Sequence, residues 1–67
     1  MKVKNYDCNP SGYDYTITLT LENGSNIHYF GVEFYRGQHI LGGNIIGLDF
    51  LEADNIIKTS VKAMNRD

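Results

Sequence analysis

The first candidate for a functional site in this chain is a cluster of glycines. Gly42, Gly43 and Gly47 lie just ahead of a helix-like segment, where a bent backbone could direct N–H groups at a phosphate. Their spacing matches neither of the glycine patterns of nucleotide-binding loops, and no lysine, serine or threonine directly follows Gly47. Asp49 and Glu52 would repel an anion at this point. We therefore interpret these glycines as backbone turns.

Two histidines and a cysteine are the other candidates. His28 and His39 could form an acid–base pair with a carboxylate such as Glu33 or Asp14. Catalysis needs a pocket, however, and a domain of this size has little room for one. Cys8 follows an acidic residue, so nothing beside it in the sequence lowers its pKa, and zinc-motif spacing is absent. We expect a non-enzymatic protein with no catalytic residue, metal or cofactor.

The length of the chain limits how it is stabilised. Its 67 residues are expected to form one domain, and a chain of this size buries only about 60% of the surface that its unfolded form exposes. Such a core supplies no more than about 3–5 kcal/mol, so natural domains of this size add a disulfide, a metal or a second subunit. A single cysteine excludes an internal disulfide. Association, as a homodimer or with another protein, is the remaining way to add stability.

Charge and hydropathy narrow the choice of partners. Six basic and eight acidic residues give a net charge of −2, which has the wrong sign for a general nucleic-acid binder and is too mild for a polyanion mimic. The N-terminal MKVKNYDCNP lacks the apolar core of a signal peptide. No apolar run approaches the roughly 18 residues of a membrane span. We expect a cytoplasmic protein, in the host cytoplasm if the chain is viral, with no membrane partner.

The clearest structural pattern is a strict alternation of apolar and polar residues over residues 13–22. Its β-branched and aromatic residues predict a strand. Asn23 and Gly24 follow, and this dipeptide favours a two-residue hairpin loop with positive φ at both positions. A second strand is predicted over residues 26–36.

The hairpin determines which side chains face the core. A two-residue loop, or a four-residue loop, places Leu19 opposite His28 and Tyr15 opposite Val32. The predicted inner face is then made of Tyr13, Tyr15, Ile17, Leu19, Phe30, Val32 and Phe34.

Two further strands are predicted on either side of this hairpin. A turn near Gly37 leads to a strand over residues 39–46, weakened by its two glycines. A short N-terminal strand over residues 2–6 pairs on the other edge, through a turn at residues 9–12.

A helix is predicted over residues 50–65. Asp49 is a good N-cap and Glu52 completes a capping box, although Asp54 is an alternative start. The apolar stripe comprises Phe50, Ala53, Ile57, Val61 and Met64. A basic stripe of Lys58, Lys62 and Arg66 is interpreted as a solvated helix face. The predicted fold class is α+β: an antiparallel three- to four-stranded β-meander packed on one C-terminal helix in two layers.

One helix covers only one face of such a sheet. Threonine, tyrosine and isoleucine dominate the other face, where lysine and glutamate would be ordinary. Hydroxyl and aromatic groups with few charges suit a protein interface, although the same residues also favour strands. The predicted partner-binding residues are Thr16, Thr18, Thr20, Ile27, Tyr29 and Tyr35.

In size and plan, a few strands plus one helix, the chain is similar to the small phage- and plasmid-encoded inhibitors that include anti-CRISPR and other anti-defence proteins. That similarity implies a small protein-binding module that acts by occluding a host protein or a defence protein. An alternative is a nucleic-acid or nucleotide-binding domain that stacks bases on Tyr29 and Tyr35 or holds a nucleotide at a dimer seam.

Overall fold

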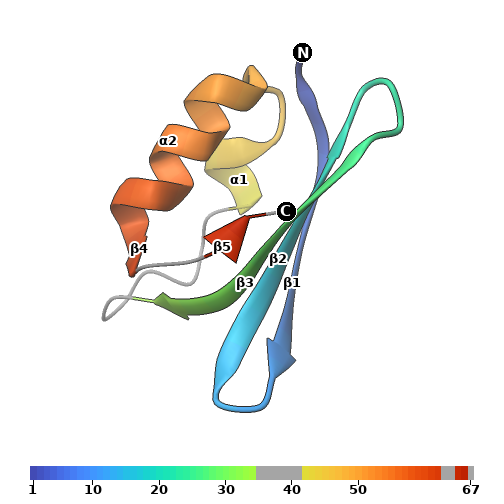
Figure 1. The fold of residues 1–67 in the computed structure, drawn as a ribbon. Helices are drawn as coiled ribbons and strands as arrows, with labels where there is room; N and C mark the ends of the chain where they lie inside the picture. Colours follow the sequence, from blue (N-terminus) through green and yellow to red (C-terminus); the bar gives the residue numbers. More distant parts are fainter. Residues whose placement is uncertain (35–41, 63–64, 67) are drawn as a thin grey trace.

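The computed structural model describes residues 1–34, 42–62 and 65–66. Its framework is a three-stranded antiparallel meander followed by a C-terminal helix, and both helices lie on one side of the sheet (Figure 1). The predicted α+β class is therefore confirmed. In chain order the elements are β1 (Val3–Ser11), β2 (Asp14–Leu21), β3 (Asn26–Phe34), α1 (Gly42–Ile45), α2 (Phe50–Ser60), β4 (Val61–Lys62) and β5 (Asn65–Arg66).

The core lies between the sheet and the helices. Ile17 and Leu19 are fully buried, as the alternation in β2 predicts. Ala53 and Ile57 are one turn apart in α2 and are equally buried, so they form the apolar stripe that faces the sheet. The buried hydrophobic residues are Val3, Ile17, Leu19, Leu21, Tyr29, Val32, Ile45, Ala53 and Ile57.

The turn between β2 and β3 differs from the prediction by one residue. Leu21 N–H donates to the Ser25 carbonyl at 2.8 Å, and Gly24 N–H donates to the Leu21 carbonyl at 2.9 Å. Gly24 has a φ of 89°, whereas Asn23 has no positive φ. The loop therefore has three residues, with the glycine in the left-handed region, rather than the two-residue loop that needs two positive φ angles.

This one-residue difference reverses the facing of the first part of β3. Leu19 pairs with Ile27 and Ile17 pairs with Tyr29. Because alternate residues of a strand face opposite sides, Tyr29 faces the helices, and the prediction that Phe30 lies on the inner face is wrong.

Gly31 restores the predicted facing in the last part of β3. The register shifts between Ile17–Tyr29 and Tyr15–Val32, so β3 contains one more residue than β2 in this interval. Gly31 has a φ of 63°, which marks a β-bulge that a residue with a side chain would adopt at a cost. Val32 is fully buried as a result.

The N-terminal strand is longer than predicted, and the described part of the predicted strand over residues 39–46 is not a strand. β1 runs to Ser11, and its turn is centred on Gly12, with a φ of 66°, and Tyr13, which is exposed rather than on the inner face. Residues 42–45 form the short helix α1 where a strand was predicted, while residues 39–41 lie outside the described residues. Close packing accounts for the glycine at position 42, because a Cβ there would lie 3.2 Å from Cδ1 of Tyr6.

The C-terminal helix ends five residues earlier than predicted. α2 stops at Ser60, after which β4 and β5 pair antiparallel with β3. Val61 pairs with Phe34, and Arg66 pairs with Tyr29. Pairing along an otherwise open sheet edge therefore replaces the last helical turns.

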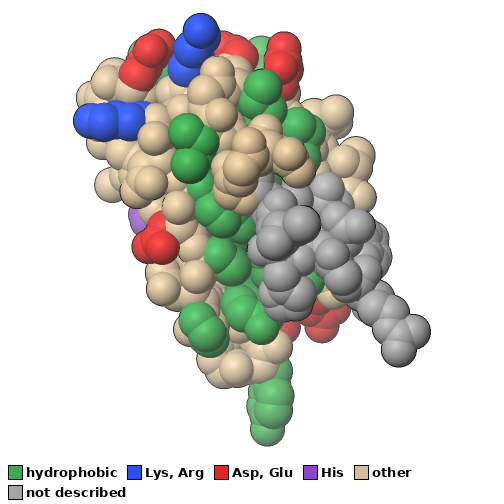
Figure 2. All heavy atoms as spheres, turned by 180° about the vertical axis from the view of Figure 1, so that it is seen from behind, with side chains coloured by type: hydrophobic (Ala, Val, Ile, Leu, Met, Phe, Trp, Pro, Cys, Tyr) green, Lys and Arg blue, Asp and Glu red, His purple; other side chains and the backbone are tan. Residues whose placement is uncertain are grey.

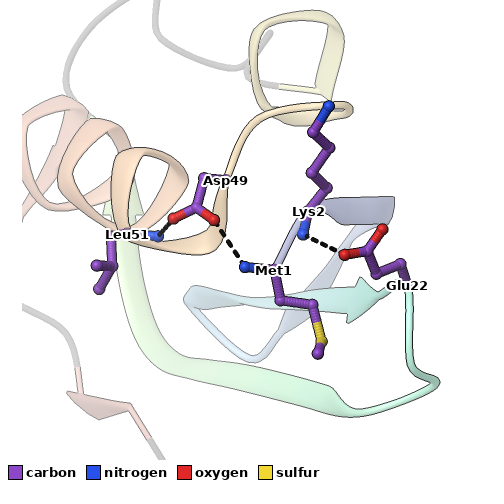
Figure 3. A network of polar contacts seen from close by, with 5 residues as sticks. All are labelled: Met1, Lys2, Glu22, Asp49 and Leu51. Atoms are coloured by element: carbon purple, nitrogen blue, oxygen red, sulfur yellow. Dashed lines mark hydrogen bonds and ion pairs between the residues drawn. The ribbon is translucent and has the colours of Figure 1, made fainter.

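The N-terminal residue is bonded to the start of α2 (Figure 3). The Met1 ammonium donates to Asp49 Oδ1 at 2.6 Å, and Leu51 N–H donates to Asp49 Oδ2 at 3.1 Å. Asp49 is therefore the N-cap of α2, as predicted. The hydrogen bond from the Met1 ammonium, followed by that from Leu51, lowers the pKa of Asp49, and the Asp49 carboxylate raises the pKa of the Met1 amino group.

Substitution of Gly31 tests the bulge. Gly31→Ala should lower the free energy of unfolding by about 1–2 kcal/mol because alanine is strained in the left-handed region, although no atom lies within 4 Å of the added Cβ. Gly43→Ala is the matched control, with an equally open Cβ position and an ordinary φ. It should leave stability unchanged or raise it by about 0.5–1 kcal/mol. Equal effects of the two substitutions in urea unfolding would contradict the bulge.

Substitution of Asp49 tests the N-terminal ion pair. Asp49→Asn keeps a capping side chain without the charge, so it should destabilise the fold mainly between about pH 4 and pH 8. The lowered carboxyl pKa stabilises the fold above the unfolded carboxyl pKa, and this effect is lost as the pH falls through the folded value. The raised amino pKa stabilises it below the unfolded amino pKa, and this effect is lost as the pH rises through the folded value.

Asp49→Ala serves as the comparison because it also removes the cap. It should add a further loss that does not vary with pH. Urea unfolding over a wide pH range measures both effects. A difference between wild type and Asp49→Asn that is constant with pH would show that the ion pair contributes nothing.

Candidate functional site

The candidate site is the sheet face that points away from the helices. We call it the open face, because none of the described helices or strands packs on it (Figure 1). The strand registers and the buried residues determine which side chains belong to it. They are Asn5, Asp7, Asn9 and Ser11 of β1, Asp14, Thr16, Thr18 and Thr20 of β2, and Asn26, His28, Phe30 and Glu33 of β3.

Hydrogen bonds between neighbouring strands order part of this face. Thr18 Oγ1 lies 3.1 Å from His28 Nδ1, with the direction of donation set by the histidine tautomer. Thr20 Oγ1 donates to Asn26 Oδ1 at 3.0 Å. The threonines are half-buried in the row between β1 and β3. Their rotamers are therefore restricted before any partner binds.

Phe30 is the apolar centre of the open face. Its side chain is 45% exposed, and its ring lies 5.9 Å from the His28 ring at an interplanar angle of 33°. None of the open-face residues of β1, β2 and β3 is basic, and the acidic ones are Asp7, Asp14 and Glu33. An exposed aromatic ring surrounded by uncharged hydrogen-bonding groups has the composition of a protein interface.

The predicted partner-binding residues divide into three groups. Thr16, Thr18 and Thr20 lie on the open face, where the alternation in β2 placed them. The placement of Ile27 and Tyr29 on this face is wrong, because the three-residue turn directs both toward the helices. Tyr35 lies outside the described residues.

Tyr29 is a core residue that connects β3 to α2. Its side chain is fully buried, and its hydroxyl donates to Asp54 Oδ1 at 2.6 Å. Asp54 is itself only 7% exposed, and its Oδ2 lies 3.0 Å from the Lys58 ammonium. A buried carboxylate needs such partners to compensate for the loss of hydration.

His28 and Phe30 are the open-face residues that the sequence analysis placed on the wrong side. Two signals in the sequence point to their true position. Asn-Gly is compatible with a three-residue loop as well as with a two-residue loop, and Gly31, within an otherwise β-branched and aromatic strand, is typical of a bulge. Together they reverse the facing of residues 27–30 and leave Val32 inside.

The other sequence candidates do not assemble into a reactive centre. Burial raises the pKa of the Cys8 thiol, and burial also raises the pKa of Tyr6. The buried Tyr6 hydroxyl has no partner within hydrogen-bonding distance and angle among the described residues, although the Cys8 thiol is near enough to affect its pKa. His39 lies outside the described residues. Lys58 is paired with Asp54 on the helix, whereas residues 62 and 66 lie in strands, so no basic helix stripe forms.

The remaining surface offers no enclosed site in the part of the chain that is described. Within residues 1–34, 42–62 and 65–66 there is no pocket and no group of three or more side chains placed to hold a metal ion. No helix in those ranges has the length and apolar character needed to cross a membrane. Seen from behind, hydrophobic side chains form a band down the middle of the molecule, and most charged side chains lie near its upper end (Figure 2).

Comparison with models of known protein families, with curated proteins and with solved structures finds no match for this chain. The geometry of the open face therefore carries the functional argument.

Removal of the Tyr29 hydroxyl tests its structural role. Tyr29→Phe should lower the free energy of unfolding by about 1–3 kcal/mol, because the buried Asp54 carboxylate loses a donor. Tyr13→Phe makes the same chemical change at an exposed hairpin tip, and its effect should stay within about 0.5 kcal/mol. Chemical unfolding of both variants measures the difference. Equal stability of the two variants would place the Tyr29 hydroxyl outside the core.

Proposed function

We propose that this chain is a non-enzymatic protein-binding module that acts by occlusion, with the open face as its contact surface. The observation that carries the proposal is the exposed ring of Phe30, set beside His28 on a face that no described element covers. Aromatic anchors surrounded by polar groups contribute most of the binding energy of protein interfaces.

The neighbours of Phe30 support this role because they are already ordered. Thr18 and Thr20 are bonded to side chains of β3, so little rotamer freedom remains for a partner to remove. Their hydroxyl groups have further hydrogen-bonding capacity. A partner that fits would offer an apolar pocket for Phe30 and polar groups around its rim.

The nucleic-acid alternative has less support than the protein-binding function. Of the two base-stacking residues that it invoked, Tyr29 lies in the core, and Tyr35 lies outside the described residues. The open-face residues of β1, β2 and β3 include no basic side chain to neutralise phosphates, and the three carboxylates among them would repel phosphates. No described residue favours a nucleotide over a protein partner.

The class of target is suggested by the plan of the molecule. A small α+β domain with one uncovered sheet face is similar in size and plan to the phage- and plasmid-encoded inhibitors that block a host protein or a defence protein. Such a protein acts by covering a functional surface of its target and needs no reactive group of its own. We therefore propose a host protein or a defence protein as the target.

A pair of lysine substitutions tests which surface binds. Phe30→Lys should weaken target binding by roughly thirtyfold or more, the loss expected for an interface hot spot. Leu51→Lys is the matched control, because Leu51 is 72% exposed on α2, on the helix side of the sheet. Proteins retained from a host lysate by wild type and by Leu51→Lys, but not by Phe30→Lys, are the expected result.

The retained protein is then titrated against each purified variant, with circular dichroism to confirm that the fold is intact. Retention that is lost with Leu51→Lys but kept with Phe30→Lys would move the binding surface to the helix side. Retention that neither substitution alters would remove the open face from the function.

A further inference from the structure

The two edges of the sheet differ in how much of their backbone is paired within the chain. The outer edge of β3 is covered by β4 and β5 of the same chain. Among the described residues, the outer edge of β1 is bonded only at its start: Val3 N–H donates to the Leu48 carbonyl at 2.8 Å, and Gly47 N–H donates to the Val3 carbonyl at 2.9 Å. Beyond Val3, β1 has β2 as its only strand partner among the described residues. Open strand edges of this kind are templates for pairing with another chain.

The hydrogen-bonding pattern between the strands shows which backbone groups of β1 lie on its outer edge. Leu21 N–H bonds toward β3, so by alternation Leu19 and Ile17 also direct their backbone groups toward β3. Their partners in β1, Tyr6 and Cys8, then direct their own groups away from β2, onto the outer edge. Pro10 has the same orientation, which explains its place in a strand, because it has no N–H to give to β2.

We propose that a second copy of this chain pairs antiparallel along the outer edge of β1, with the two-fold axis at Cys8. In this register the two Cys8 residues exchange a pair of backbone hydrogen bonds. Tyr6 N–H of each copy donates to the Pro10 carbonyl of the other. The N–H groups of Tyr6 and Cys8, which have no partner among the described residues, are then satisfied, and the missing N–H of Pro10 is not needed.

Two-fold axes at the two residues that precede Cys8 fit less well. Residues opposite one another in a continuous sheet share a face, so the two-fold axis must pass through a residue of β1 rather than between residues. An axis at Asp7 would set two carboxylates side by side, which is destabilising. An axis at Tyr6 would place Cys8 opposite residue 4, where the β1–β2 register is irregular.

The side chains on the open face complement this register. Asp7 of each copy lies opposite Asn9 of the other, so an amide donor meets a carboxylate twice. The same two groups already bond within one chain, where Asn9 Nδ2 donates to Asp7 Oδ2 at 3.1 Å. No like charges lie opposite one another among residues 6–10, because Asp7 is the only charged residue there.

The partner that fits a self-complementary edge is a second copy of the same chain. In such a two-fold symmetric contact, each favourable pair of residues occurs twice. Edge pairing alone buries little surface, so the dimer is weak and forms at high concentration. It joins two sheets into one and sets two open faces side by side. The pairing uses the edge and not Phe30, so it stands apart from the proposed function.

Two substitutions of opposite charge test the register. Asn9→Asp sets like charges opposite Asp7 at both symmetric positions, and Asn9→Lys sets opposite charges there. We expect the dimer dissociation constant to rise about two- to thirtyfold for Asn9→Asp and to fall by a similar factor for Asn9→Lys. Sedimentation equilibrium over roughly 10 µM to 1 mM measures it. Asn26→Asp and Asn26→Lys, on β3, are matched controls and should change nothing.

Cross-linking tests the position of the axis. A hydrogen-bonded antiparallel pair has its Cα atoms about 5.5 Å apart, within the range of a disulfide. Because burial raises the pKa of Cys8, a copper–phenanthroline oxidant is used to accept the two electrons that leave the thiols. Disulfide dimer should form faster for Asn9→Lys than for wild type, and slowest for Asn9→Asp.

Three results would overturn the proposal. They are a monomer throughout the concentration range, a dimer that responds equally to substitutions at positions 9 and 26, and a dimer that oxidation does not cross-link. None of these results bears on whether Phe30 binds a target, so the two proposals fail separately.

Discussion

The facing of β3 is the constraint on which the rest of the structure depends. A three-residue loop that ends at Gly24 directs Ile27 and Tyr29 toward the helices, and the bulge at Gly31 then keeps Val32 inside. Each glycine has a positive φ, a conformation that a side chain makes costly. A shift of one residue at either point would exchange the buried and exposed faces of part of this strand.

Both the stability and the proposed function follow from this facing. Tyr29 reaches Asp54 of α2 because it points inward, so a buried hydrogen bond joins the helix to the sheet, and Lys58 of the same helix pairs with the Asp54 carboxylate. Phe30 is exposed beside His28 for the same reason, one residue further along. The core contact and the candidate binding anchor are therefore adjacent residues on opposite faces of one strand.

Local patterns predicted the parts of the fold that depend on local physics. The alternation in β2 and the Asp49 cap follow from strand periodicity and from capping, and both were confirmed. Asn23-Gly24 was misread because the dipeptide suits two loop lengths that differ in facing. The end of α2 at Ser60 could not be predicted locally, since pairing with distant residues of β3 competes with helix there. Of the candidate site, the threonine row was placed correctly, whereas Ile27 and Tyr29 were not.

Ring-proton nuclear Overhauser effects in solution test the facing of β3 most directly. The account predicts cross-peaks from the Tyr29 ring to protons of α2, including those of Asp54, and cross-peaks from the Phe30 ring to His28 with none to α2. Cross-peaks from the Phe30 ring to α2, together with a Tyr29 ring that shows none, would contradict it.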